Sequence, residues 1–99
     1  MERRCVITGL GVVTPLGNTV EEYWNGLNYI KKFDTTDYKV KIAAEIKDFD
    51  PEQYMTKKDV KRNDLFAIYA LAAGMQAFED SKLDMEKEDA DRIGVIVGS

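Results

Sequence analysis

Residues 5–17 read CVITGLGVVTPLG. The run Val6–Thr8 is β-branched and apolar on both sides, which is typical of a central strand covered on both faces of a parallel sheet. Gly9, Gly11 and the group Pro15–Gly17 then predict a tight turn. This stretch indicates an α/β fold that begins with a buried strand.

The end of the chain repeats the strand pattern, and a long helix is expected in between. Residues 92–99 read RIGVIVGS, a second strand that is apolar on both faces. The chain is expected to be helical from a capping box at Thr56 and Asp59 to about Asp80. Its second part, residues 65–78, has almost no polar face, as in a helix buried on every side. Two parallel strands joined by a helix predict a right-handed crossover.

A short helix is expected directly after the first turn. Asn18 or Thr19 can cap it, because either side chain accepts a hydrogen bond from the exposed amides of a first helical turn. Gly26 weakens this helix near its end. Tyr23 and Trp24 are expected to make core contacts within its apolar stripe, which comprises Val20, Tyr23, Trp24 and Leu27.

A small strand and a second short helix are expected in the middle of the chain. Residues 40–46 alternate imperfectly between polar and apolar side chains, as in a strand open to water on one side. Asp50 can cap the helix that follows, with Pro51 at its first position and an end near Met55.

The composition narrows the class of protein. The 99 residues make one domain at most, and the net charge of −4 argues against a general nucleic-acid binder. The chain has one cysteine and no histidine, which excludes an internal disulfide and makes a zinc site implausible. No apolar run is long enough for a membrane span, and no signal peptide is expected at the start. A reduced, cytoplasmic setting fits these observations.

The predicted elements need more layers than the chain provides. A chain of this length buries only about 60–70% of the surface that its unfolded form exposes. Two doubly covered strands and the helix 65–78 would therefore leave a large apolar patch, and such patches usually mark a partner surface. We expect the remainder of a larger protein or a second copy to cover that helix.

Two candidate sites near the N-terminus have simple structural interpretations. Gly9 and Gly11 suggest a dinucleotide-binding turn, but Thr14 stands where the third glycine is needed, so a structural turn is favoured over a small nucleotide-binding domain. Cys5 opens a buried strand and has no histidine to serve as its base. We therefore interpret Cys5 as a core residue rather than a nucleophile.

Two clusters of charge lie further along the chain. Lys58, Lys61 and Arg62 share one helix face beside Lys57, and they are either a solvated face paired with nearby carboxylates or a docking site for an acidic protein. Cations near a helix N-terminus are mildly unfavourable, which favours docking. The acidic loop before the last strand lacks the glycine of an EF-hand and is interpreted as solvated; it contains Asp84, Glu86, Glu88, Asp89 and Asp91.

Several stretches, taken in order, resemble β-ketoacyl-(acyl carrier protein) synthases, in particular the type II elongating enzymes. They cover nearly the whole chain, and residues 8–17 are the most specific. The stretches are RRCVITGLGVVTPLGN, VEEYWNGL, FDTTDYKVKIAAEIKDFDPE, KRNDLFAIYALAA and RIGVIVGS.

The resemblance implies a thiolase-like fold with αβαβα layers, of which residues 1–99 would be the N-terminal portion of one domain, with no second domain. It implies cytoplasmic homodimers that condense acyl groups with malonyl-(acyl carrier protein), with no redox or metal cofactor. The family's nucleophilic cysteine, two histidines and lysine would all lie beyond residue 99. The chain alone is therefore expected to be inactive, with no catalytic residue of its own.

One family function maps onto residues that are present. In these synthases a basic patch on the helix matching residues 56–64 docks the acidic carrier protein, and Lys58, Lys61 and Arg62 occupy the matching positions. A non-catalytic docking or scaffold piece is the alternative function.

The chain departs from the family pattern at two places. The loop between Leu27 and Phe33 is several residues shorter than is usual in the family. Lys82 replaces a common glycine that suits the left-handed end of a helix, at a cost of about 1 kcal/mol if that conformation is kept.

Overall fold

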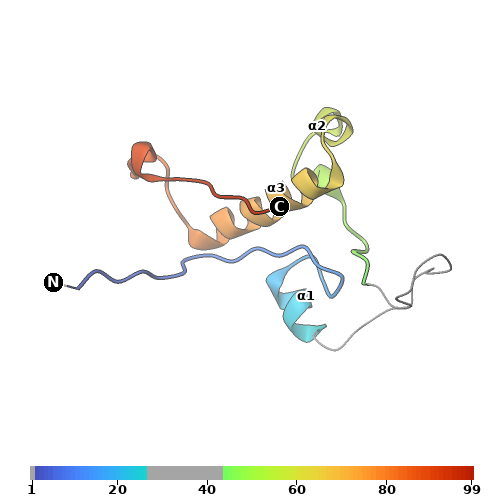
Figure 1. Ribbon diagram of the computed structural model, residues 1–99, viewed down its shortest axis with the longest axis horizontal. Helices are drawn as coiled ribbons and strands as arrows, with labels where there is room; N and C mark the ends of the chain where they lie inside the picture. The colour runs from blue at the N-terminus through green and yellow to red at the C-terminus, as the bar shows by residue number, and fades with distance from the viewer. Residues whose placement is uncertain (1, 27–43) are drawn as a thin grey trace.

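A computed structural model of the protein describes residues 2–26 and 44–99 (Figure 1). Three α-helices and two 3₁₀ helices occur among these residues. In chain order they are α1 (Val20–Asn25), η1 (Pro51–Gln53), α2 (Lys57–Arg62), α3 (Leu65–Ser81) and η2 (Ala90–Arg92).

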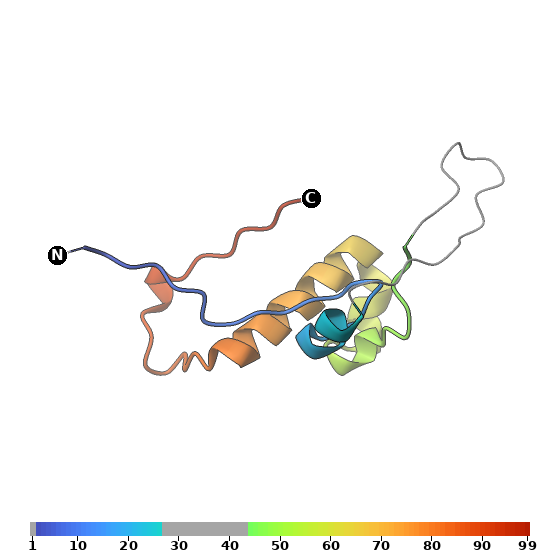
Figure 2. The same cartoon turned by 90° about the horizontal axis from the view of Figure 1, so that it is seen from below.

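Helix α3 is the element against which the N-terminal segment packs. Figures 1 and 2 both show this segment running alongside α3 and in the opposite direction. A Cβ atom added to Gly9 would collide with the carbonyl oxygen of Ala77, and one added to Gly11 with that of Ala73. The two glycines therefore allow the extended backbone to lie directly on the helix.

The C-terminal segment runs in the same direction as the N-terminal segment, and both oppose α3 (Figures 1 and 2). This is the chain direction expected for two parallel strands joined by a helix. The predicted sheet, however, does not form among the described residues, where the only bridge joins Thr14 to Gly17 within the turn. Val95 and Ile96 are 88% and 99% exposed, so the C-terminal segment has neither a neighbouring strand nor a covering layer here.

The predicted small strand falls mostly outside the described residues. Ala44–Ile46, the described part of it, has no regular secondary structure. The shortened loop after Leu27 also lies outside the described residues.

The expected continuous helix from Thr56 to Asp80 is wrong, because the chain forms two helices. Asn63 and Asp64 both have extended backbone angles, with ψ of 145° and 159°. The side-chain nitrogen of Asn63 donates to the carbonyl oxygen of Asp59 at 2.8 Å. This carbonyl lies in the last turn of α2, where carbonyl groups have no partner within the helix. A polar residue that can cap a helix locally competes with helix continuation.

The predicted helix starts are confirmed. The Thr19 hydroxyl accepts from the amide of Glu22 at 3.2 Å, and Gly26 caps the end of α1. The Asp50 carboxylate accepts from the amide of Glu52, and Pro51 takes the first position of η1 as expected. The element is a single 3₁₀ turn that ends at Gln53, shorter than the helix expected to reach about Met55. Such local signals act over a few residues and therefore do not depend on tertiary packing.

The described residues form only a small core. Ile68 and Ala72 are the only buried hydrophobic residues among them, at 3% and 0% exposure. Trp24 is 73% exposed and Cys5 is also exposed, so the expected burial of these two residues is wrong here. The Cα radius of gyration is 16.9 Å, against about 13 Å for a compact domain of this length. The apolar surface of the chain thus remains largely uncovered.

Candidate functional site

The predicted docking residues lie together on α2. Four of the chain's 14 lysines and arginines fall within this six-residue helix, although the chain as a whole carries a net charge of −4. All four are exposed, and Lys58, Lys61 and Arg62 share one face because residues three or four apart are neighbours on a helix. The helix therefore presents a compact positive surface on an acidic chain.

The cations of α2 have no carboxylate partner among the described residues. The single ion pair found in residues 2–26 and 44–99 joins Lys87 to Asp84. Asp59 instead accepts a 2.6 Å hydrogen bond from the hydroxyl of Thr56. The interpretation of a solvated face neutralised by Asp59 and Asp64 thus finds no support, and the positive charge remains available to a partner.

The end of α2 changes one part of the electrostatic argument. Because the helix ends at Arg62, Lys61 and Arg62 lie in its last turn, where the helix dipole favours cations. Only Lys57 and Lys58 occupy the unfavourable first turn. The local dipole therefore does not require a partner for the whole cluster, and the absence of carboxylate partners is the stronger observation.

Helix α2 is held on the body of the chain through η1, which contacts both α2 and α3. Two aromatic contacts support this arrangement. Phe49 stacks on Tyr54 with ring centroids 6.1 Å apart, and it meets Tyr69 of α3 edge-on at 5.1 Å. Such pairs contribute about 0.5–1.5 kcal/mol beyond their buried area.

Gln76 of α3 connects three separate segments and was not identified from the sequence. Its side-chain oxygen accepts from the amide of Val12 at 3.1 Å. Its side-chain nitrogen donates to the carbonyl oxygen of Asn18 at 2.7 Å and to the hydroxyl of Tyr54 at 2.9 Å. The feature of the sequence that could have identified Gln76 is its position as the only amide side chain within the apolar run 65–78.

The turn 14–18 continues this polar region. Thr14 and Gly17 exchange backbone hydrogen bonds of 2.9 and 3.1 Å. The side-chain nitrogen of Asn18 donates to the carbonyl oxygen of Lys47 at 2.7 Å, while its side-chain oxygen is buried without a hydrogen-bond partner. Gly9 and Gly11 pack on α3 before this turn, so in this chain they serve close packing rather than a phosphate cradle.

The described residues contain no catalytic arrangement built on Cys5. Its thiol is exposed on the N-terminal segment, and the chain has no histidine to act as its base. No group of three or more potential metal ligands comes together within residues 2–26 and 44–99.

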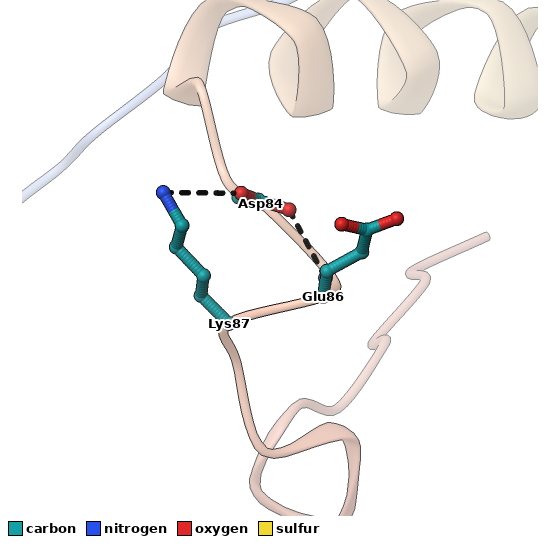
Figure 3. A network of polar contacts seen from close by, with 3 residues as sticks. All are labelled: Asp84, Glu86 and Lys87. Carbon is teal, nitrogen blue, oxygen red and sulfur yellow. Dashed lines mark hydrogen bonds and ion pairs between the residues drawn. The ribbon is translucent and has the colours of Figure 1, made fainter.

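The acidic loop is organised by its own backbone (Figure 3). The Asp84 carboxylate accepts from the amide of Glu86 at 3.0 Å and pairs with Lys87 at 3.4 Å. Asp89 likewise accepts from the amide of Asp91 at 3.1 Å. These carboxylates accept hydrogen bonds from nearby backbone amides and do not converge on one point. This arrangement fits the interpretation of the loop as solvated.

An open apolar hollow of about 540 Å³ lies between α3 and the C-terminal segment. Leu71 and Phe78 contribute large side chains to it, and Gly74 leaves open space where a Cβ would stand. Across the hollow, Val95 and Val97 complete its lining.

No helix within the described ranges has the length and hydropathy needed to cross a bilayer.

Comparison with known proteins gives a consistent family match. Residues 2–99 match the model of the β-ketoacyl synthase N-terminal domain. The chain is 49% identical to 3-oxoacyl-(acyl-carrier-protein) synthase 2 of Vibrio cholerae and 45% identical to that of Vibrio harveyi. It is 41% identical to the synthase of the same name from Synechocystis. Each match covers 99% of this chain but 25% of the relative, so the chain spans about a quarter of the length of these proteins.

Proposed function

The chain belongs to the β-ketoacyl synthase family, and from this premise we propose that it forms part of a 3-oxoacyl-(acyl carrier protein) synthase that elongates fatty acids in the cytoplasm. The reaction would be the condensation of an acyl group with malonyl carried on acyl carrier protein. The names of the relatives, which are 41–49% identical over nearly the whole chain, support this function.

The 99 residues would contribute to this enzyme without supplying its catalytic groups. Condensation in this family requires a cysteine nucleophile and histidines, whereas the chain has only the exposed Cys5 and no histidine. We therefore expect this chain to show no condensing activity when it is assayed alone. Turnover of acyl and malonyl carrier proteins by the purified 99-residue chain would contradict this part of the proposal.

The thiolase-like αβαβα architecture is part of the same proposal. The N- and C-terminal segments run in the same direction along α3, as neighbouring parallel strands of one layer would (Figure 2). Their exposed apolar side chains require further layers. The proposal is that the remainder of the synthase supplies the missing strands and covers the hollow beside α3.

A second copy of the chain is the other candidate to cover that hollow, in keeping with a homodimeric synthase. Hydrogen exchange of α3 distinguishes the two occupants. If the remainder of the synthase covers α3, the amides of residues 66–78 exchange slowly at every protein concentration. If a second copy covers them, their protection is lost when the dimer is diluted below its dissociation constant.

The contribution of the described residues to the reaction would be docking of the acidic carrier protein. Lys58, Lys61 and Arg62 are exposed, share a helix face and lack carboxylate partners in the described part of the chain. A positive patch of this kind steers a negative partner and fixes its orientation. The docking residues are part of these 99 residues, whereas the expected catalytic groups are not. A non-catalytic docking or scaffold piece is therefore the alternative function.

The experiment that tests docking is a pair of matched charge reversals in the full-length protein. Lys61→Glu with Arg62→Glu should weaken carrier binding at low salt by about tenfold or more, because each rim charge contributes to long-range attraction. Lys87→Glu with Arg92→Glu changes the net charge equally at the other end of α3 and should leave binding nearly unchanged. Equal affinities for the two double variants would remove the docking proposal.

A further inference from the structure

We propose that Gln76 is a positioning residue for the docking face of α2, although it carries no charge and lies on another helix. The inference rests on the proposed docking function and names the group that fixes the orientation of the docking surface. It follows from the hydrogen bonds of Gln76 and from the place of Tyr54 just before α2.

Gln76 uses both ends of its amide in a partly buried setting. The bonds to Val12, Asn18 and Tyr54 reach across 64, 58 and 22 positions of sequence. Only the bond to Tyr54 reaches the segment that precedes α2. Loss of the amide would leave partly buried polar groups without these partners, which costs stability, so the three segments hold one another in place.

Tyr54 passes this restraint to α2 over a very short path. It ends η1, and the amide of Tyr54 donates to the carbonyl oxygen of Pro51 at 3.0 Å. Thr56, two residues later, caps α2 by accepting from the amide of Asp59 at 3.3 Å. The basic residues therefore begin within one turn of a side chain whose hydroxyl is fixed by Gln76.

The aromatic contacts hold the same region but leave the position of the hydroxyl free. Phe49 meets both Tyr54 and Tyr69 through ring faces and edges. Rings in contact can slide at small cost, whereas a hydrogen bond restricts distance and direction. We assign the fixed orientation of η1, and with it that of α2, to the bond between Gln76 and Tyr54.

Positioning and charge affect different steps of binding. Long-range attraction depends on the sum of the charges and changes little when α2 shifts by a small distance. The bound complex depends on close matching of charged groups and therefore reports such a shift in its dissociation rate. Loss of the Gln76 amide should accordingly raise the dissociation rate and leave the association rate nearly unchanged.

The test uses carrier-protein binding kinetics of the full-length protein. Gln76→Met and Tyr54→Phe should each raise the dissociation rate about three- to tenfold, and the double variant should add little beyond either one. Gln76→Glu replaces the donating nitrogen with an oxygen that would face the carbonyl oxygen of Asn18, so it should raise the dissociation rate as Gln76→Met does. Gln53→Met in η1 is the matched control, because that glutamine is exposed and its removal should have no effect.

The outcomes separate this inference from the docking proposal. Unchanged dissociation in Tyr54→Phe, a change that retains the ring and the fold, would overturn the positioning role even if Gln76→Met fails to fold. If Lys61→Glu with Arg62→Glu weakens binding while the Gln76 and Tyr54 variants do not, docking stands and positioning falls. If the charge reversals also have no effect, both fall. Strictly additive effects of Gln76→Met and Tyr54→Phe would likewise contradict a shared bond.

Discussion

The backbone amide of Leu10 donates to the carboxylate of Asp80, 2.9 Å away, across 70 positions of sequence. The amide of Val12 donates to Gln76 in the same way, one helical turn earlier on α3. Alternate amides of an extended chain point to the same edge. Two side chains of a helix thus occupy one edge of the N-terminal segment at these positions, and a neighbouring strand must pair with the opposite edge there.

Replacement of Asp80 by alanine should loosen the N-terminal segment. The bond to Leu10 involves a carboxylate but is exposed, so its loss should cost about 1 kcal/mol locally. Amide hydrogen exchange should then be about fivefold faster at Leu10, with a smaller change at Val12. Glu79→Ala, on the adjacent exposed position, is the control. Equal exchange in both variants would show that Asp80 does not hold the segment.

Gly74 allows a test of whether the hollow beside α3 is covered. An alanine there meets open space in this chain and should raise the helix content of the isolated 99 residues, measured by circular dichroism, since alanine favours a helix interior by about 1 kcal/mol over glycine. In the full-length protein the same methyl group should collide with the covering layer and lower the melting temperature. A higher melting temperature there would indicate that the hollow stays open.

Lys82 should be a position where glycine stabilises the protein. It ends α3 with φ of 57° and ψ of 28°, a left-handed conformation that costs a residue with a side chain about 1 kcal/mol. Lys82→Gly should therefore raise the free energy of unfolding by about that amount. Lys82→Ala removes the same side chain but keeps the strain, so the difference between the variants isolates the backbone effect. No difference between them would contradict the strain.

The docking surface predicts a salt dependence of association. The Debye length is about 10 Å at 0.1 M ionic strength, so attraction between α2 and an acidic carrier should weaken as salt rises. The association rate of the full-length protein should fall with salt, and Lys61→Glu with Arg62→Glu should flatten that dependence. Stopped-flow measurements from about 0.01 M to about 1 M salt, over which the Debye length falls from roughly 30 Å to about 3 Å, would check this. A steep slope that persists in the variant would place the attraction elsewhere.

Local features of the fold could be predicted from the sequence because they depend on neighbouring residues. Thr19, Asp50 and Thr56 each cap the element that follows them, and each reaches an amide only two or three positions away. The break at Asn63 is equally local, but two local signals compete there. Its charged surroundings are all compatible with helix, and the extended angles arise from a cap that competes with the helix.

Burial and strand pairing could not be predicted in the same way, because they depend on groups outside each segment. The residues 92–99 have the pattern of a doubly covered strand, but Ile96 is 99% exposed in this chain. Trp24 fits an apolar stripe and is nevertheless exposed. A pattern shows which side chains require cover and does not show what covers them.

The sequence predicts the charged residues of the candidate site but not the contacts that hold α2 in place. The spacing of Lys58, Lys61 and Arg62 indicated a common face, which the helix α2 provides. The contact of Gln76 with Tyr54 joins residues 22 positions apart, and no periodic pattern relates them. Only the isolation of one amide in an apolar run marked Gln76 as unusual.

The two extended residues between α2 and α3 have a consequence for how such a protein can change over generations. In an unbroken helix, Arg62 would stand one turn before Phe66, so that a cation and an apolar ring shared a face. A mutation that suited one surface would then disturb the other. With Asn63 and Asp64 extended, the rotation of one helix no longer sets that of the next. Selection can therefore retune the charges for a different partner while the interior of the protein stays as it is.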